Sequence, residues 1–380
     1  MASFVSSSPP PPIYDVVVVG SGIAGLLTAE MVLTSLPNSK VLVLERNNAV
    51  GGRAQVVSPN SPFDLGGAWS WSDDRLSKLT TRLGIKKFAQ PSKGSDVILQ
   101  DLYGGGQRVT THTGGQLLAC GPGAERIEGG VGGIPLTLSA SIQEKGGEVK
   151  LNTEVKRVKV VDGIVTLNDD VQARYVVIAA PPQLIATNVE FDPPLPSSQL
   201  STMLATQTWM HGTGKAIIEY ALPWWSVSGL NLCSTGTSRL GGHIDVTWDN
   251  SDYTNGKYAI GMFVSEGATE DNVREEIEVI FGGDGEKVKG IERVTVKVWD
   301  DVGIKGLSAS TATYGSETLR MELGGRVVFS GTETEDEHGH IEGAVISGER
   351  AAKTVLAKIK GDNDKMREGG ECAGDIRAPA

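Results

Sequence analysis

The sequence predicts an α/β protein in which a domain with a parallel sheet is interleaved with a smaller α+β domain. Residues 16–19 form an apolar run that ends at Gly20, and a helix-like stretch then leads to a second predicted strand at residues 40–44. A further apolar run, residues 175–180, ends at a pair of prolines. Residues 341–359 carry apolar side chains at steps of three and four, which is typical of an amphipathic helix. Strands that alternate with helices in this way favour a parallel sheet.

The glycines after the first apolar run have the Gly-x-Gly-x-x-Gly spacing of a dinucleotide-binding turn. Gly20 permits a tight turn, Gly22 lets the backbone approach a pyrophosphate, and Gly25 allows the helix to pack closely on the strand. The amides that open the helix face the phosphate charge, and an acid after the second strand accepts hydrogen bonds from ribose hydroxyls. The residues that this unit predicts to contact the nucleotide are Gly20, Gly22, Ile23, Ala24, Gly25, Glu45 and Arg46.

Two further segments favour a flavin over a nicotinamide. Residues 51–53 read Gly-Gly-Arg, and residues 63–69 read Phe-Asp-Leu-Gly-Gly-Ala-Trp. With them the chain resembles the flavin-dependent amine oxidase family, which includes monoamine and polyamine oxidases. The resemblance implies a Rossmann-like FAD-binding domain, with Arg53 near the FAD pyrophosphate and the later segment along the flavin. A solvated surface charge is the less favoured interpretation of Arg53. The residues that the resemblance assigns to FAD here are Gly52, Arg53, Gly66, Gly67, Ala68 and Trp69.

Composition limits the classes of partner and compartment. The formal net charge of -11 argues against nucleic acid, because phosphate binding needs concentrated Lys and Arg. The three cysteines, Cys120, Cys233 and Cys372, are widely spaced and fit neither a disulfide framework nor a zinc site. Neither a secretory signal nor an apolar run of the ~20 residues that a membrane helix needs is found. We therefore expect a soluble cytoplasmic protein whose oligomeric state the sequence leaves open.

The chain is predicted to pass between two domains more than once. Strands are predicted at residues 148–151, 155–161, 163–167, 215–219, 258–264, 294–299 and 327–330, with two more within 97–111 around three glycines. Helices are predicted at residues 75–83, 136–145 and 269–281. By resemblance, the FAD-binding domain comprises residues 13–87, 131–204 and 302–360, the substrate domain comprises residues 88–130 and 205–301, and flexible tails comprise residues 1–12 and 361–380. The first substrate-domain segment is much shorter than in typical family members, so helices that usually cover part of the active site are predicted to be missing.

The second strong motif lies near the C-terminus. Residues 329–334 read Phe-Ser-Gly-Thr-Glu-Thr, and residues 339–344 read Gly-His-Ile-Glu-Gly-Ala. This stretch is very similar to the C-terminal motif of monoamine oxidases. The resemblance places Gly331 and Glu333 beside the FAD ribityl and pyrophosphate groups, and the Ile341 amide at the flavin O2 edge. A helix N-terminus carries roughly half a positive charge, which stabilises negative charge on a reduced flavin. An amphipathic helix that caps a sheet is a compatible interpretation.

The loop between these two segments contains acids and histidines, Glu335, Asp336, Glu337, His338 and His340. A metal site is nevertheless not predicted, because one short loop offers few ligands and no second cluster completes a site.

Three other positions have roles by resemblance. Lys215 matches a lysine that holds a water near flavin N5, although a lysine on a strand is ordinarily solvated. Val155 matches a valine whose backbone meets the adenine, and an ordinary strand residue is an equally good interpretation. Trp299 matches a tryptophan that packs near the flavin, with core burial as its alternative. Lys215 and His340 are the predicted catalytic residues.

Two departures from the family matter. Monoamine oxidases attach FAD through a cysteine, whereas Ser310 stands at that position here, so noncovalent FAD is predicted. The two tyrosines of the family's aromatic cage correspond to Thr311 and His340. Only His340 can present a ring, so simple aryl-alkyl amines become less favoured substrates.

The leading functional prediction is an FAD-dependent oxidase. It transfers hydride from the carbon beside an amine nitrogen to flavin N5. The resulting imine is hydrolysed, and dioxygen reoxidises the flavin to give hydrogen peroxide. An alternative is a dehydrogenase or desaturase of the phytoene desaturase or protoporphyrinogen oxidase type, since these enzymes share the dinucleotide motif. A catalytically silent flavin-binding protein is the third possibility.

Overall fold

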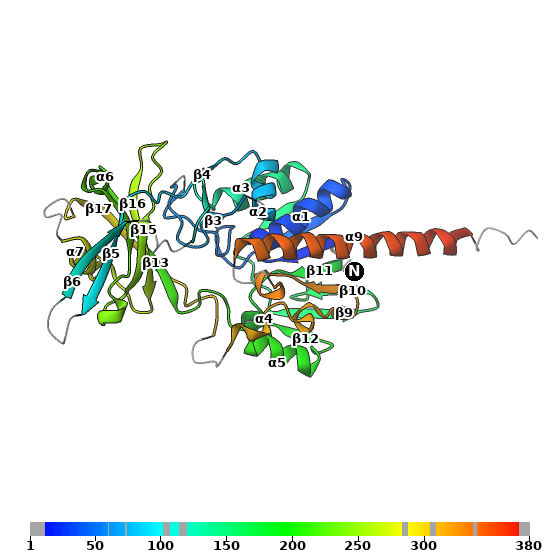
Figure 1. Ribbon diagram of the computed structural model, residues 1–380. Coiled ribbons are helices and arrows are strands. Elements are labelled where there is room, and N and C mark those ends of the chain that lie inside the picture. Colours follow the sequence, from blue (N-terminus) through cyan, green and yellow to red (C-terminus); the bar gives the residue numbers. More distant parts are fainter. Residues whose placement is uncertain are drawn as a thin grey trace, which may run out of the picture.

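The computed structural model describes residues 12–59, 61–72, 74–101, 107–113, 120–282, 288–304, 309–336 and 340–371. Two lobes are joined by several crossings of the chain (Figure 1). One lobe is built on an eight-stranded sheet and the other on a seven-stranded sheet. A three-stranded sheet lies between the lobes and consists of β3 (Trp69–Ser70), β7 (Glu125–Ile127) and β4 (Lys87–Ala89).

The eight-stranded sheet has a parallel centre. Strand β1 pairs in parallel with β2 and β11, and β2 and β11 pair in parallel with β8 and β18 respectively. An antiparallel hairpin, β9–β10, extends the sheet beyond the first half of β11. The strands are β1 (Ile13–Val19), β2 (Val41–Leu44), β8 (Glu148–Lys150), β9 (Arg157–Val161), β10 (Ile164–Leu167), β11 (Val171–Ile178), β12 (Glu190–Asp192) and β18 (Val327–Phe329).

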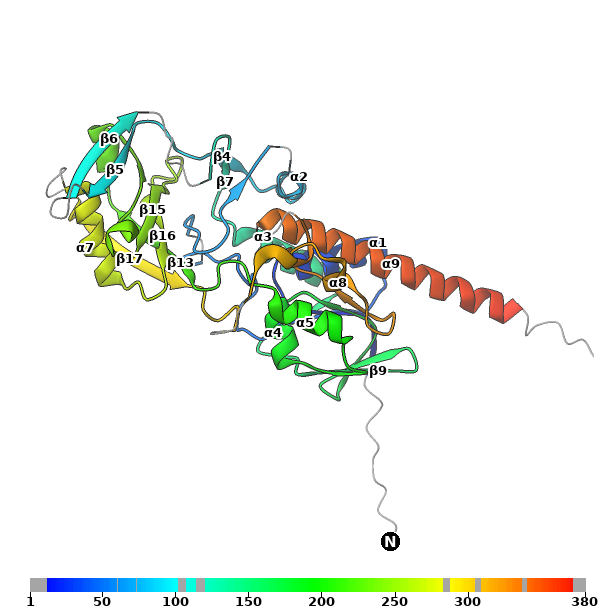
Figure 2. The ribbon, with the colours of Figure 1, turned by 60° about the horizontal axis from the view of Figure 1, so that its bottom comes forward.

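Both faces of this sheet are covered, which explains the unbroken apolar run of β1. Val16 and Val18 face one core with α1, α2, α3 and α9, whereas Val17 and Val19 face a second core that includes side chains of α4, α5 and α8. Figure 2 shows α4 and α5 on the side opposite α9. Strands buried on both faces are expected to be apolar throughout. The helices are α1 (Ile23–Ser35), α2 (Arg75–Arg82), α3 (Gly133–Glu144), α4 (Pro182–Asn188), α5 (Ser197–Ala205), α8 (Glu317–Arg320) and α9 (Ile341–Glu371).

The second lobe has one sheet and its own core. Ala216 and Ile218 of β13 face this core, together with side chains of α6 and α7. Ile217 points the other way and packs against Phe63 and Leu65 of the first lobe. Because side chains alternate along a strand, Lys215 lies on the same face as Ile217, toward the first lobe. In sheet order the strands are β17 (Ile291–Val298), β13 (Thr213–Tyr220), β16 (Tyr258–Ser265), β15 (Ile244–Asp249), β14 (Leu230–Ser234), β5 (Ser95–Asp101) and β6 (Gln107–Thr113), with helices α6 (Trp224–Ser228) and α7 (Glu270–Phe281).

Most predicted elements are present, with shifted ends. The hairpin predicted within residues 97–111 is confirmed as β5 and β6, although its three glycines lie outside the described residues. Helix α3 begins at Gly133, three residues earlier than predicted, because Pro135 is tolerated in a first helical turn. Strand β11 begins at Val171, because its first residues pair with β10.

Helix α9 is longer than the sequence indicated. It continues to Glu371, past the predicted end near residue 359, and extends beyond the body of the lobe (Figure 1). Residues 361–371, which the sequence analysis assigned to a flexible tail, are helical. The strands of the larger sheet come from residues 13–44, 148–192 and 327–329, and those of the second sheet from residues 95–113 and 213–298. The detailed domain ranges stay a prediction.

Candidate active site

The turn between β1 and α1 leaves no room for side chains at two of its glycines. Gly20 has a positive φ of 103°, and a Cβ there would lie 2.4 Å from the Ala179 carbonyl oxygen. A Cβ on Gly25 would lie 2.1 Å from the Gly20 oxygen. Gly22 differs, because a Cβ there would meet no atom within 4 Å. The turn is therefore tightly packed toward the protein and open above Gly22.

The N-terminus of α1 faces this open space without a cap. Gly22 occupies the N-cap position, which makes no side-chain hydrogen bond, and the first turn has no acidic residue. The first amides of a helix have no partner within the helix, so those of Ile23 and Ala24 can donate to an anion. The side chains of both residues are buried, and only the backbone is offered.

Glu45 lies beside the glycine turn, whereas Arg46 does not take part in it. The Glu45 carboxylate is buried, and its Oε2 accepts hydrogen bonds from the Ser21 backbone N (2.9 Å) and Oγ (2.7 Å). Its Oε1 accepts from the backbone N of Asn47 at 2.9 Å. Arg46 is exposed and donates to the Asp301 carbonyl oxygen at 3.0 Å. Of these two residues predicted to contact the nucleotide, Glu45 therefore faces the glycine turn, whereas Arg46 contacts Asp301 instead.

Arg53 and Glu333 form an ion pair that joins the two sequence motifs. Two guanidinium nitrogens of Arg53 lie 2.6 and 3.1 Å from the two carboxylate oxygens of Glu333. The Glu333 side chain is fully buried, and that of Arg53 is a quarter exposed. Burial opposes the charge of Arg53, but the neighbouring Glu333 carboxylate outweighs it and raises the pKa of Arg53. The backbone N of Trp209 also donates to Glu333, at 3.3 Å.

The glycines of the 66–69 segment are in close contact with both motifs. A Cβ on Gly66 would lie 1.7 Å from the Arg53 carbonyl oxygen. A Cβ on Gly67 would lie 2.5 Å from the side chain of Ile341, the first residue of α9. Ala68, which follows, is buried. The structure therefore brings this segment against both Arg53 and the N-terminus of α9.

Trp299 and Val155 are both buried side chains. Trp299 donates its Nε1 hydrogen to the Leu65 carbonyl oxygen at 3.0 Å, which fixes the ring beside the glycine segment. Val155 precedes β9 and belongs to the core that also contains Val17 and Val19. The assignment of its backbone to the adenine stays a prediction.

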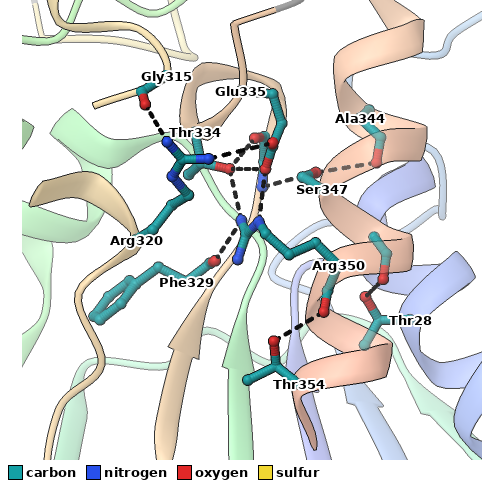
Figure 3. Close-up of polar contacts among 12 residues, drawn as sticks. Thr28, Gly315, Arg320, Phe329, Thr334, Glu335, Ala344, Ser347, Arg350 and Thr354 are labelled. Atoms are coloured by element: carbon teal, nitrogen blue, oxygen red, sulfur yellow. Dashed lines mark hydrogen bonds and ion pairs between the residues drawn. The ribbon is translucent and has the colours of Figure 1, made fainter. Parts of the chain in front are cut away.

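A polar network fixes the turn that carries Glu333 (Figure 3). Gly331 has a positive φ of 138°, and its N–H donates to the Ser347 hydroxyl at 3.1 Å. Arg350 of α9 donates to Glu335 at 2.8 Å and to the carbonyl oxygen of Phe329 at 3.0 Å. Arg320 lies on the other side of Glu335, at 3.9 Å. The turn after β18, which includes the short 3₁₀ helix Thr332–Thr334, is thereby tied to the first turns of α9.

Lys215 is buried in an aromatic environment. Its Nζ lies 4.8 Å from the ring centroid of Trp69 and 5.4 Å from those of Trp248 and Phe263. The side chain is 2% exposed, and its Nζ has no hydrogen-bond partner among the described residues. Burial lowers the pKa of Lys215 to about 8, and the carboxylate of Asp64 acts in the opposite direction. Lys215 is therefore not the solvated strand lysine that the sequence offered as the alternative. Its role near flavin N5 stays a prediction.

His340 is flanked by two tryptophans that the sequence analysis did not select. Its ring centroid lies 6.3 Å from that of Trp71 and 5.9 Å from that of Trp209. Thr311, the other cage position, is exposed and lies in the 3₁₀ helix Thr311–Thr313. Trp209 follows a segment that runs beside that helix, since Gln207 donates its backbone N–H to the Ser310 oxygen at 3.1 Å. The segment that leads to Trp209 thus pairs with the residue before Thr311.

Sequence reasoning also missed Asp64 and Arg126 as functional candidates. Both are fully buried beside Lys215, and their charges act on it. Asp64 belongs to the motif of residues 63–69, which could have indicated it. Arg126 comes from a short strand that the sequence did not predict. No local pattern identifies a residue whose partners are so far apart along the chain.

Among the described residues, His, Cys, Asp and Glu side chains form no group of three or more that could hold a metal ion. Residues 337–339 of the acidic loop lie outside the described ranges. In the same described part of the chain, no helix combines the length and apolar character that a membrane span needs.

The residues present fit a flavin dinucleotide. The uncapped α1 N-terminus and the open space above Gly22 suit a pyrophosphate, and Glu45 suits ribose hydroxyls. Lys215 offers a buried Nζ that has no hydrogen-bond partner among the described residues.

The chain belongs to a known family. Residues 99–356 match the family described as flavin containing amine oxidoreductase, and residues 18–83 match the NAD(P)-binding Rossmann-like domain. The first match covers more than half of the chain. The predicted family and the Rossmann-like fold class are confirmed, and FAD is the cofactor that this family implies.

Individual relatives agree with the family. The chain is 28% identical to a putative flavin-containing monoamine oxidase, AofH, of Mycobacterium tuberculosis over 253 residues, which are 62% of this chain and 53% of the relative. It is 30% identical to amine oxidase B of Canis lupus familiaris over 239 residues, 56% of this chain and 44% of the relative. The matches thus span about half the length of these two relatives. A structure of putrescine oxidase bound to putrescine has a similar fold, with a TM-score of 0.73, 18% identity, and coverage of 92% of this chain and 100% of that one.

Proposed function

We propose that this chain is an FAD-dependent oxidase that oxidises an amine at the carbon next to its nitrogen. The observation that supports this most is the position of the 66–69 segment. Gly67 contacts Ile341 at the start of α9, and two residues later Trp69 packs under the Lys215 ammonium. Two positions of one short segment therefore contact the helix N-terminus and the buried lysine. The flavin edge would lie along this segment.

The nucleotide half of FAD would be held by groups around the β1–α1 turn. The amides of Ile23 and Ala24 and the side chain of Arg53 offer positive charge to the pyrophosphate, and Glu45 accepts from the ribose. Glu333 keeps the Arg53 guanidinium in one orientation through two parallel hydrogen bonds. When bound, FAD supplies the acceptor for two electrons from the amine's C–H bond and passes them to dioxygen, which becomes hydrogen peroxide.

The chain's own groups would stabilise charge and hold a proton. The N-terminus of α9, with the Ile341 amide, stabilises negative charge that develops beside it. Lys215 can hold or release a proton on Nζ near pH 8, because burial lowers its pKa to about 8. Three aromatic rings exclude bulk water from that ammonium.

The amine would enter past the rings of Trp71, Trp209 and His340. Aromatic faces attract ammonium groups, so these rings suit a cationic amine. Because Thr311 has no ring, Trp209 is the candidate for the second aromatic wall. The putrescine seen with the structurally similar oxidase is an amine of this kind.

Peroxide release tests the proposal. The purified yellow protein is mixed with mono-, di- and polyamines in air, and peroxide is followed with a coupled peroxidase. Peroxide from at least one amine is expected, and protein stripped of flavin serves as the blank. Anaerobic mixing in parallel should bleach the flavin band with the same amine.

The same experiment distinguishes the two alternatives. Bleaching without peroxide, together with turnover on a quinone acceptor, would indicate a dehydrogenase. A flavin that no donor reduces would indicate a silent flavin-binding protein, for which the exposed Thr311 and the short segment of residues 88–130 are the arguments.

A further inference from the structure

Three charged side chains are buried together where the two lobes meet. Asp64 is 1% exposed, Arg126 is 0% exposed and Lys215 is 2% exposed. Asp64 comes from the loop before β3, Arg126 from β7 and Lys215 from β13. Buried charges are costly unless they are paired, so this cluster needs an explanation beyond packing.

Arg126 binds both lobes and Asp64 at once. It donates to the Pro62 carbonyl oxygen at 2.9 Å and to the carbonyl oxygen of Asn250 in the second lobe. Its Nη2 lies 3.7 Å from Oδ2 of Asp64. The other carboxylate oxygen, Oδ1, accepts from the Val131 backbone N at 2.6 Å. One carboxylate oxygen is thus hydrogen-bonded, and the other, Oδ2, makes only the ion pair with Arg126 among the described residues.

Lys215 has no such partner. Two of its three neighbouring rings are themselves held by hydrogen bonds, since Trp69 Nε1 donates to Gln90 at 2.9 Å and Trp248 Nε1 donates to the Asn250 side chain at 3.1 Å. Trp69 also stands opposite Arg126 in the β3–β7 pair, so both side chains lie on the same face of that small sheet. Among the described residues, only Arg126 of these two buried cations forms an ion pair with Asp64, so the Asp64 charge acts on Lys215 from farther away.

We propose that Asp64 is a positioning residue for Lys215: its carboxylate keeps the lysine an ammonium, and Arg126 holds that carboxylate between the lobes. Arg126 has a second effect, because its own positive charge repels the ammonium. The two residues act on Lys215 in opposite directions. The charge state of Lys215 does not depend on the proposed function. Only the role of this lysine in amine oxidation rests on it.

The charged and titratable groups around the cluster define the expected behaviour. Burial lowers the pKa of Lys215 to about 8, while Asp64 raises it and Arg126 lowers it further. Burial raises the pKa of Asp64 to about 6, and both cations act against this. Between about pH 6 and 8, Asp64 is therefore ionised while Lys215 is charged. The remaining groups that face Lys215 or Arg126 are Cys120, Asp249 and Asp252.

The test is a pH titration of the full-length, purified protein between pH 6 and 10. The near-ultraviolet circular dichroism of the tryptophans reports the charge that lies over Trp69 and Trp248. A transition near pH 8 is expected, and Lys215→Met should abolish it, which assigns it to this lysine. The readout requires neither an amine nor turnover.

The variants should move this transition in opposite directions. Asp64→Asn removes the attracting charge and should lower the midpoint by about one pH unit, whereas Arg126→Gln removes the repelling charge and should raise it by a similar amount. Arg126→Lys keeps the charge and should leave the midpoint near the wild-type value. Cys120→Ser is the matched control, because burial raises the pKa of this thiol to about 11 and it stays neutral throughout.

Midpoints that stay together or move in the same direction would overturn the proposal, as would the absence of a transition that Lys215→Met removes. If Asp64→Asn does not fold, Arg126→Gln and Arg126→Lys are compared instead. Only Arg126→Gln should shift the midpoint of the transition. Failure of the proposed function would look different. The titration would behave as described, but no amine would release peroxide or bleach the flavin.

Discussion

The turn after β1 consists mainly of backbone groups, whereas the cluster around Lys215 consists of side chains. The turn is made of backbone amides and glycines within a few residues of one another, and its only charged side chain is Glu45. The cluster is made of side chains from three separate elements, with charges that are buried and incompletely paired. One region offers backbone groups that any sequence possesses, and the other depends on which side chains meet.

This difference has an energetic side. A helix N-terminus offers its amides at little cost, because they are unpaired in every helix. Buried charges lower stability unless partners compensate them. The cluster around Lys215 therefore reduces the stability of the fold at the place where chemistry is proposed, whereas the turn does not. Changes in the two regions should separate binding from stability.

The largest effect is expected at the ion pair that links the two motifs. Arg53→Ala leaves the fully buried Glu333 carboxylate without its partner, so unfolding free energy should fall by roughly 3–5 kcal/mol and FAD occupancy should drop. Urea denaturation and the ratio of visible to ultraviolet absorbance measure the two. Arg75→Ala is the control, because its pair with Glu349 is more exposed than the pair of Arg53 with Glu333, so its loss should change little. Full FAD occupancy in Arg53→Ala would contradict the assignment.

The next effect concerns the pH dependence of stability. The pKa of Lys215 falls from its ordinary value of 10.5 to about 8 on folding, so the unfolded chain binds the extra proton between these values. Wild-type stability should therefore rise with pH from about 8 to 10.5, by about 3 kcal/mol from this group, and the burial cost should be fully present below pH 8. Thermal denaturation of Lys215→Met should lack this rise. Lys78→Met on the exposed face of α2 should keep it, and equal slopes in both variants would refute the buried ammonium.

A pair of identical substitutions should separate binding from folding within the turn. Gly22→Ala places a methyl group in open space, so the protein should fold as stably as the wild type while FAD affinity falls about tenfold or more. Gly25→Ala places the methyl group against the Gly20 oxygen and should destabilise the fold itself. Melting temperature and flavin titration of the apoprotein distinguish these outcomes. Unchanged flavin affinity in Gly22→Ala would place the pyrophosphate elsewhere.

The smallest effect is expected at the aromatic rings. Trp209→Ala removes one ring beside His340, and the loss of a cation–π contact of about 0.5–2 kcal/mol should raise KM for a cationic amine with a smaller change in kcat. Trp209→Phe keeps a ring and should recover most of the affinity. Equal KM values for wild type and Trp209→Ala would remove this residue from the substrate path.

Sequence reasoning succeeded where the determinants are local. The apolar run before Gly20, the acid at the end of β2 and the periodic apolar residues of α9 each lie within one element, so their positions follow from spacing alone. The hairpin β5–β6 was found for the same reason. Lys215 and Glu333 were selected because their neighbours along the chain resemble a family.

Other features depend on tertiary contacts that spacing does not encode. The pairing of Arg53 with Glu333 joins residues 280 positions apart, and Arg126 reaches carbonyl groups in both lobes. Trp71 and Trp209 look like ordinary aromatic residues in the sequence, and only the fold brings their ring centroids to 6.3 and 5.9 Å from that of His340. Strands β14 and β15 were missed as well, although β15 (Ile-Asp-Val-Thr-Trp-Asp) alternates apolar and polar residues.

The most direct test of the central claim is to ask whether the chain carries FAD between the β1–α1 turn and α9. The freshly purified protein is precipitated with acid, and the visible spectrum and mass of the released cofactor are measured. Because Ser310 stands where a linking cysteine would be needed, about one FAD per chain should appear in the supernatant. A colourless protein that takes up no added FAD, or colour that stays with the pellet, would contradict the account.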